Sequence, residues 1–94
     1  MSGSGRFSWP DGSLYTGDWK ENRPHGYGAL KEKDGSSYEG TFSYGYKRGR
    51  GILKNADGSH FEGHWANDRE HGKGTLVSAE GEKTVGIWVK GQLT

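Results

Sequence analysis

Hydrophobic and polar residues alternate along most of the chain, with glycines interleaved among the aromatic residues. In the segment 15–19, an aromatic residue, a glycine and a second aromatic residue occupy every other position. A spacing of two is that of a β-strand, whose side chains point alternately to the two faces of a sheet. Glycine at every fourth or fifth position would cost a helix too much stability. The pattern therefore predicts strands near 5–9, 14–19, 26–31, 37–42, 49–54, 60–65, 72–77 and 84–89.

The pattern repeats every 23 residues, and glycine shows the interval most clearly. Gly17, Gly40, Gly63 and Gly86 lie 23 residues apart, and all 18 glycines belong to sets related by this period or by twice its length. The other residues that define the repeat are Tyr15, Trp19, Gly26, Gly28, Tyr38, Phe42, Gly49, Gly51, Phe61, Trp65, Gly72 and Gly74. The period predicts one domain, with a half-repeat at 1–12, repeats at 13–35, 36–58 and 59–81, and a half-repeat at 82–94.

The turn residues predict how consecutive strands are joined. Asp-Gly or Glu-Gly pairs separate the repeats, as in tight hairpin turns. Leu30 shares a face with Tyr38 only if their hairpin loop has an odd number of residues, which predicts a three-residue loop that ends in Gly35 with positive φ. The other connection, 20–25, is predicted to be a longer, variable loop that accommodates Pro24. The predicted fold is an all-β, single-layer antiparallel meander of eight strands, in which aromatic rings lie across glycines of the neighbouring strand.

Composition changes this picture little. Only 29% of the residues are hydrophobic, against roughly 45–50% in soluble domains, but four Trp, five Tyr and three Phe supply a core that the aliphatic residues do not. The absence of cysteine excludes disulfides and thiolate metal sites. A net charge of +1 provides no global field for nucleic acid, so no nucleic-acid partner is expected. No apolar run approaches the roughly 20 residues of a membrane-spanning helix, and a cytoplasmic setting is expected.

The unit 38–42, Tyr-Glu-Gly-Thr-Phe, followed by 49–53, Gly-Arg-Gly-Ile-Leu, resembles the MORN (membrane occupation and recognition nexus) motif. The units that begin at Tyr15 and Phe61 resemble it too, so the resemblance covers essentially the whole chain. It implies a non-enzymatic scaffold in a cytoskeletal, ciliary or membrane-junction assembly, with either protein partners or acidic phospholipids. The stretch 63–74 resembles the radial-spoke type.

Catalytic, cofactor and metal chemistry find little support in the sequence. The Gly-x-Gly pairs recur as strand residues and open no helix, which excludes a dinucleotide-binding motif. No catalytic residue or cofactor is therefore expected. His60, Glu62 and His64 alternate on one strand face, but nothing supplies a second shell for a metal, and no metal site is expected. His25 and His71 are interpreted as structural residues at loop-to-strand boundaries.

Two surfaces are candidate interaction sites. Tyr44 and Tyr46 occupy a loop position where the other repeats have no aromatic residue, so we expect them to be exposed and to bind a protein partner. The same segment supplies an alternative acidic-phospholipid site, although a solvated strand face with ordinary charge pairs is favoured over it. The residues of the lipid-binding alternative are Lys47, Arg48, Arg50 and Lys54.

The second candidate surface is the last strand, which carries Val85, Ile87 and Val89 where earlier repeats have polar residues. An apolar strand with an unpaired ladder edge invites another chain. A homodimer through this edge, or a strand or helix of a partner, is therefore expected. The alternative is that a longer array continues beyond it.

Overall fold

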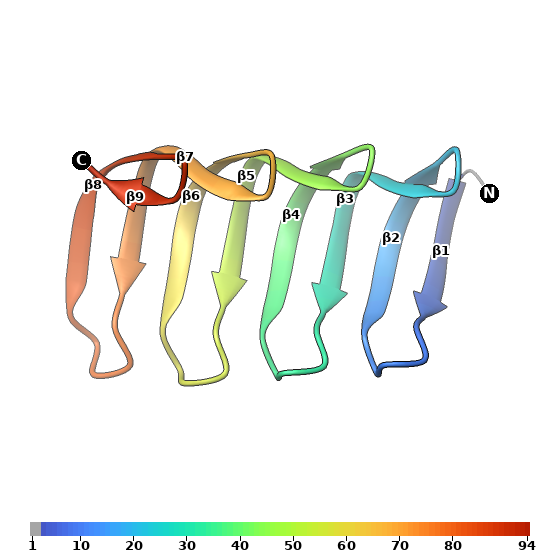
Figure 1. Ribbon diagram of the computed structural model, residues 1–94, viewed down its shortest axis with the longest axis horizontal. Coiled ribbons are helices and arrows are strands. Elements are labelled where there is room, and N and C mark those ends of the chain that lie inside the picture. The colour runs from blue at the N-terminus through green and yellow to red at the C-terminus, as the bar shows by residue number, and fades with distance from the viewer. Residues whose placement is uncertain (1–2) are drawn as a thin grey trace.

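The computed structural model describes residues 3–94 and consists of one antiparallel sheet of nine strands in chain order (Figure 1). The strands are β1 (Gly3–Ser8), β2 (Leu14–Lys20), β3 (Arg23–Lys31), β4 (Ser37–Ser43), β5 (Tyr46–Lys54), β6 (His60–Ala66), β7 (Arg69–Val77), β8 (Lys83–Val89) and β9 (Gln92–Leu93). The all-β, single-layer meander is confirmed. The predicted number of strands, eight, is wrong because the chain turns back once more to form β9. Residues 1–2 of the predicted half-repeat 1–12 lie outside the described residues.

The turns between repeats have the predicted register and length. Leu30 lies opposite Tyr38, and Gly28 opposite Gly40. The amide of Glu32 donates to the Ser36 carbonyl at 2.9 Å, which leaves a three-residue loop closed by Gly35 with φ of +93°. This conformation is the one that favours glycine at the end of the turn.

At the opposite edge, the longer loop expected at 20–25 is wrong. Lys20 pairs directly with Arg23 across a two-residue turn, Glu21–Asn22, whose φ values of 51° and 66° are those of a type I′ turn. This turn matches the twist of the strands that it joins. The extra residues form a bulge in β3 instead, because Gly17 pairs with Gly28 while Trp19 pairs with Pro24. The strands β3, β5 and β7 therefore begin three residues earlier than expected.

The type I′ tips dock on one another along this edge. Each tip after the first donates an amide hydrogen to a carbonyl of the preceding hairpin: Gly45 to Pro24 (2.8 Å), Asp68 to Lys47 (3.2 Å) and Gly91 to Glu70 (2.9 Å). Figure 1 shows the tips bent over the strands and following one another along one edge of the sheet. We call this side, where one set of strand ends lies, the tip edge, and the opposite side the turn edge; both run across the strands and differ from the edge strands β1 and β9.

The core is a continuous row of aromatic rings on one face of the sheet, which we call the inner face. The rings of Tyr15, Trp19, Tyr38, Phe42, Phe61, Trp65 and Trp88 are buried there. Rings of successive repeats meet edge to face, with centroid distances of 5.3 Å for Tyr15–Phe42 and 5.2 Å for Tyr38–Trp65. Edge-to-face packing is a favoured arrangement of aromatic pairs. The row therefore links every repeat to the next without a second layer.

Glycines make this packing fit, as predicted. A Cβ atom on Gly28 or Gly51 would overlap the hydroxyl of Tyr15 or Tyr38, and one on Gly74 would overlap the ring of Phe61. Gly17, Gly40 and Gly63 are similarly confined between a ring and the backbone of the next strand. Beyond the last repeat, the side chain of Leu93 lies against Gly86 in place of a ring. The rings thus bury their area against the sheet itself.

Candidate interaction surfaces

The tyrosines predicted to bind a partner lie at one type I′ tip, and both are exposed. Tyr44 is 39% exposed and packs on the preceding hairpin: its ring centroid is 4.6 Å from that of His25, and its amide donates to His25 Nδ1 at 3.1 Å. Tyr46 is 53% exposed and begins β5. Tyr44 therefore also anchors its own tip, whereas Tyr46 is the freer ring of the pair.

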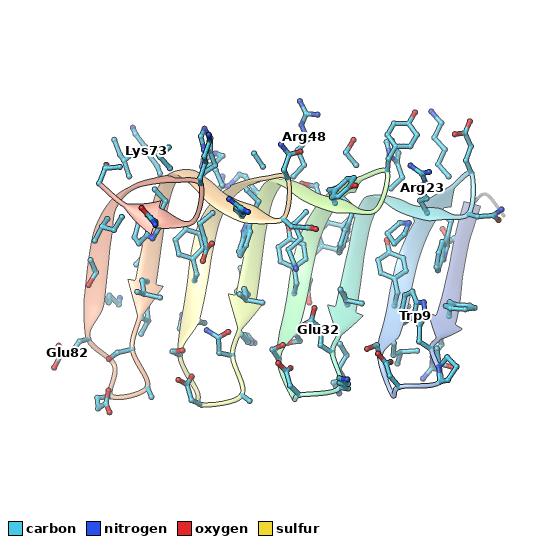
Figure 2. The ribbon with its side chains drawn as sticks, in the orientation of Figure 1. Trp9, Arg23, Glu32, Arg48, Lys73 and Glu82 are labelled. Atoms are coloured by element: carbon cyan, nitrogen blue, oxygen red, sulfur yellow. The ribbon has the colours of Figure 1, made fainter. Side chains whose placement is uncertain are left out.

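His25 and His71 make structural contacts, as interpreted, but they lie within β3 and β7 and not at loop-to-strand boundaries, because these strands begin at Arg23 and Arg69. His71 accepts a hydrogen bond from the Lys90 amide at 3.4 Å, as His25 does from Tyr44. Each imidazole thus ties its hairpin to the next tip. In the middle repeat Arg48 takes this position, and Figure 2 shows its side chain projecting from the tip edge.

The four cations of the lipid-binding alternative are dispersed over the sheet. Lys47 lies on the inner face, with Nζ 5.4 Å from the Tyr38 ring centroid. Arg50 lies opposite His64 on the other, outer face. Lys54 is at the far end of β5, opposite Ser37 near the turn edge. The structure therefore does not bring these cations together on one surface.

The carboxyl-terminal strand presents its apolar side chains to solvent. Val85 is 77% exposed, and Ile87 and Val89 are also exposed. The expected free edge is only partly free, because β9 pairs with Trp88 and Val89 and the amide of Thr94 donates to the Ile87 carbonyl at 2.9 Å. The uncovered part of the edge is limited to the start of β8.

The outer face also carries His60 and His64, the two histidines considered as metal ligands. His64 Nδ1 lies 3.2 Å from the Lys73 carbonyl oxygen. Within residues 3–94, no three histidine or acidic side chains converge as a set able to hold a metal ion.

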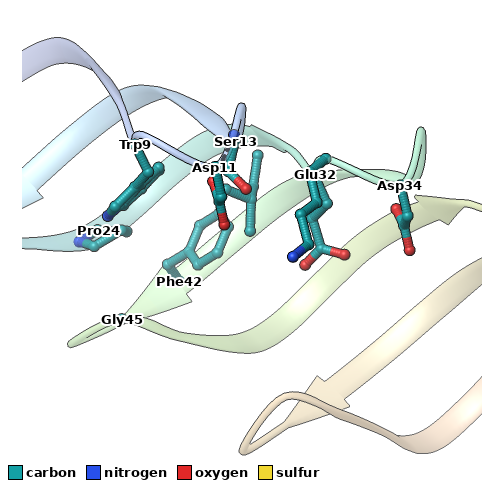
Figure 3. Close-up of a pocket in the computed structure, with 10 residues that line it drawn as sticks. Trp9, Asp11, Ser13, Pro24, Glu32, Asp34, Phe42 and Gly45 are labelled. Atoms are coloured by element: carbon teal, nitrogen blue, oxygen red, sulfur yellow. Dashed lines mark hydrogen bonds between the residues drawn. The ribbon is translucent and has the colours of Figure 1, made fainter.

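A groove of about 490 Å³ opens on the inner face between the first two hairpins. We call it the inner groove. Its apolar walls are Trp9, Pro24, Leu30 and Phe42, and the polar side chains that line it are Asp11, Ser13, Glu32, Lys33 and Asp34. Figure 3 shows Trp9 and Pro24 at one end and Glu32 and Asp34 at the other. The groove thus joins an aromatic end to an acidic one.

Hydrogen bonds hold the carboxylates of this groove in place. Asp11 accepts the Ser13 amide at 2.8 Å, and Asp34 accepts both the amide (2.9 Å) and the hydroxyl (2.6 Å) of Ser36. These bonds lower the pKa of both aspartates below the ordinary value. Both groups are therefore negatively charged at neutral and mildly acidic pH.

A family model for the MORN repeat matches residues 1–14, 15–37, 38–60 and 61–83. The chain belongs to the MORN repeat family. A search of the curated proteins gave no match. The three complete MORN units begin with Tyr15, Tyr38 and Phe61, the rings that cover the paired glycines. Over residues 3–94, this MORN chain has no helix with the length and apolarity needed to cross a bilayer.

The inner groove was not predicted from the sequence, although two departures from the MORN repeat mark it. Trp9 stands where the later units have Glu32, Asn55 and Ser78, and Pro24 stands where they have Lys47 and Glu70. The predicted fold followed from residues that the units share. What differs between them identifies the position of the groove.

Proposed function

We propose that this MORN chain is a protein-binding segment of a larger scaffold, of the cytoskeletal, ciliary or membrane-junction kind that its family resemblance suggests. The observation that supports this proposal is the open inner face. A one-layer sheet has no second sheet or helix over its aromatic residues, and between the first two hairpins this leaves a groove with Trp9, Pro24 and Phe42 in its walls. Aromatic residues in concave sites are typical anchors of protein interfaces.

The exposed tyrosine tip supports the same function from a second position. Tyr46 presents an exposed ring beside Arg48, and tyrosine and arginine are enriched among residues that dominate binding energy. A partner that reached both the tip and the inner groove would contact two consecutive hairpins.

Binding to acidic phospholipid is the second candidate function. Tyr44, Tyr46 and Arg48 are exposed at one tip, as a membrane-facing loop would require. The dispersion of Lys47, Arg50 and Lys54 over different faces and ends disfavours this candidate, because a flat membrane meets only one of these surfaces.

Affinity capture at two ionic strengths, together with flotation on vesicles of phosphatidylcholine and phosphatidylserine, separates the two functions. Protein binding predicts captured partners that persist at high salt and are lost from the Tyr46→Ser variant, with no flotation. Lipid binding predicts flotation that disappears at high salt, since the screening length falls from about 8 Å at physiological ionic strength to about 3 Å at 1 M salt. Capture of no protein that persists at high salt, together with salt-sensitive flotation, would refute the protein-binding proposal.

A further inference from the structure

We infer that the inner groove binds a short segment of a partner protein in which a lysine or arginine adjoins apolar side chains. This inference deepens the proposed function and rests on it. It assigns the partner's contact chemistry to one groove, lined by residues that the sequence pattern alone did not identify as functional.

The apolar half of the groove provides the docking surface. Phe42 is buried and forms part of the core, while Trp9 is half-buried and stands edge to face against Phe7 at 4.8 Å. Leu30 and Pro24 are also only half-buried. A second hollow shares Trp9 and Pro24 with the groove and is also lined by Trp19, whose buried indole N–H has no partner among the described residues. This end of the inner face therefore retains apolar area that an apolar partner side chain would bury.

The polar half of the groove determines the sign of the partner's charge. Asp11, Glu32 and Asp34 contribute three carboxylates against the single ammonium group of Lys33. Asp11 and Asp34 accept their hydrogen bonds on Oδ1. The Ser36 hydroxyl, which has one hydrogen to donate, lies 2.6 Å from Asp34 Oδ1 and 2.9 Å from Glu32 Oε2. The second oxygen of each carboxylate remains for a cation. A lysine or arginine that lies against Trp9 would gain both a charge contact and a cation–π contact.

The gap between the second and third hairpins differs from the inner groove, and the difference explains why the site is assigned to the inner groove alone. There Lys47 replaces Pro24, and its ammonium group lies over the Tyr38 ring. Glu32 replaces Trp9 at the turn edge. The second gap thus already holds a cation of its own over its aromatic surface. The first gap offers the same kind of surface. Its one cationic side chain, Lys33, comes from the turn after β3, and no lysine or arginine of the described residues lies over the rings of this gap. The partner therefore supplies the cation there.

Selection of random peptides displayed on phage against the intact chain tests the inference. We expect the enriched peptides to contain a lysine or arginine next to an apolar residue. Each enriched peptide is then synthesised with a fluorescent label, and its dissociation constant is measured by fluorescence anisotropy for the wild type and for variants. Trp9→Ser should weaken binding about tenfold or more, since it removes an aromatic anchor.

A matched pair of variants isolates the charge contribution. Asp11→Asn keeps the side-chain acceptor for Ser13 and removes only the charge, and it should weaken binding about fivefold. Asp57→Asn removes a charge from the equivalent turn two repeats further on, outside the groove, where Asp57 accepts the Ser59 amide in the same way, and it should leave affinity unchanged. Because both variants keep their turns, the comparison does not depend on whether Trp9→Ser folds.

Three outcomes would overturn the inference: no enriched peptide, enriched peptides without a cation, or equal affinity for wild type, Trp9→Ser and Asp11→Asn. The proposed function is tested by a different result from the groove assignment. If Tyr46→Ser still loses its captured proteins while no groove-dependent peptide emerges, protein binding stands and the groove assignment is wrong.

Discussion

On the inner face a gap lies between each hairpin and the next, and the first of these gaps is the inner groove. The first two gaps have the same backbone arrangement but different side chains in their walls. In each gap a tip amide bonds a carbonyl of the preceding hairpin, 2.8 Å at Pro24 and 3.2 Å at Lys47. In each, a tyrosine ring covers a glycine and meets the next repeat's aromatic ring. Only the side chains at the walls differ, and they leave the first gap open. In this sheet, residues that the repeats share maintain the tip contacts and the ring-over-glycine packing, which we call the frame. Residues that depart from the repeat determine what a gap can bind.

The largest predicted effect is on the shared frame. In Gly51→Val, the new side chain would overlap the Tyr38 ring, and we expect a loss of about 3 kcal/mol or more from a total stability of about 5–10 kcal/mol. Thermal unfolding followed by circular dichroism measures the effect. The control is Ile52→Val, which places the same residue at the next position and should cost only about 0.5–1.5 kcal/mol. A Gly51→Val protein that melts with the wild type would contradict the ring-over-glycine packing.

Alkaline pH should weaken the same frame in the two tyrosine repeats. Burial raises the pKa of Tyr15 to about 12 and that of Tyr38 in the same direction, from an ordinary value of 10.0. The folded state thus favours the neutral phenol, so this stabilisation is complete below pH 10 and is lost as pH rises through the folded-state pKa.

Melting temperatures measured at intervals from neutral pH to about pH 12 test this prediction. The double variant Tyr15→Phe and Tyr38→Phe should lose much of the alkaline decline, because Phe does not ionise. An identical decline in the wild type and in the double variant would show that other groups cause it.

Exchange of one wall residue between the gaps should alter binding without altering the frame. Pro24→Lys places in the first gap the residue that the second gap has, and its ammonium group would compete with the partner's cation. We expect groove-binding peptides to bind about tenfold more weakly, a change of about 1.4 kcal/mol. Stability should change little, because Pro24 contributes a backbone carbonyl to the tip contact. The control Pro24→Ala should weaken binding less, and equal effects of the two variants would show that charge is not the reason.

The frame could be predicted from the sequence because its determinants are periodic. The alternation of Tyr38, Gly40 and Phe42 predicted a strand face, and Gly35 predicted its turn. The type I′ tips were missed because Glu21–Asn22 lacks the glycine that usually marks such turns. Their positive φ values are maintained by strand pairing on either side and by docking on neighbouring tips. The strand β9 was missed although its turn contains Gly91, because Lys90, with φ of 50°, occupies the first turn position, where Asn, Asp or Gly is usual.

The candidate site could be predicted only in part. The exposure of Tyr44 and Tyr46 followed from a local departure from the repeat. The inner groove depends on Trp9 from the turn after β1, Pro24 from β3 and Phe42 from β4, which meet only through the fold. A linear cluster such as 47–54 predicted proximity, but a strand places successive side chains on opposite faces and its two ends far apart. Cations that are close in the sequence were therefore separated in space.

The smallest predicted effect distinguishes the third repeat from the first two. Tyr15 and Tyr38 donate their hydroxyl hydrogens to carbonyls three residues further along, at Asp18 (2.8 Å) and Thr41 (3.0 Å). Phe61 cannot make the equivalent bond to the His64 carbonyl. Phe61→Tyr should therefore add about 0.5–1.5 kcal/mol, which raises the melting temperature by several degrees in a domain of this size.

The direction of that change depends on a small movement of the ring. The Phe61 and Trp88 ring centroids are 4.8 Å apart, whereas those of Tyr38 and Trp65 are 5.2 Å apart. The Phe61 ring itself lies over Gly74, where the Tyr38 hydroxyl lies over Gly51. A tyrosine at position 61 has to withdraw by a few tenths of an ångström to the position that Tyr38 adopts. The reverse change, Tyr38→Phe, should lower the melting temperature by a similar amount. If Phe61→Tyr instead melts below the wild type, the third repeat packs too tightly to accept the hydroxyl, and the three units are less interchangeable than their backbones indicate.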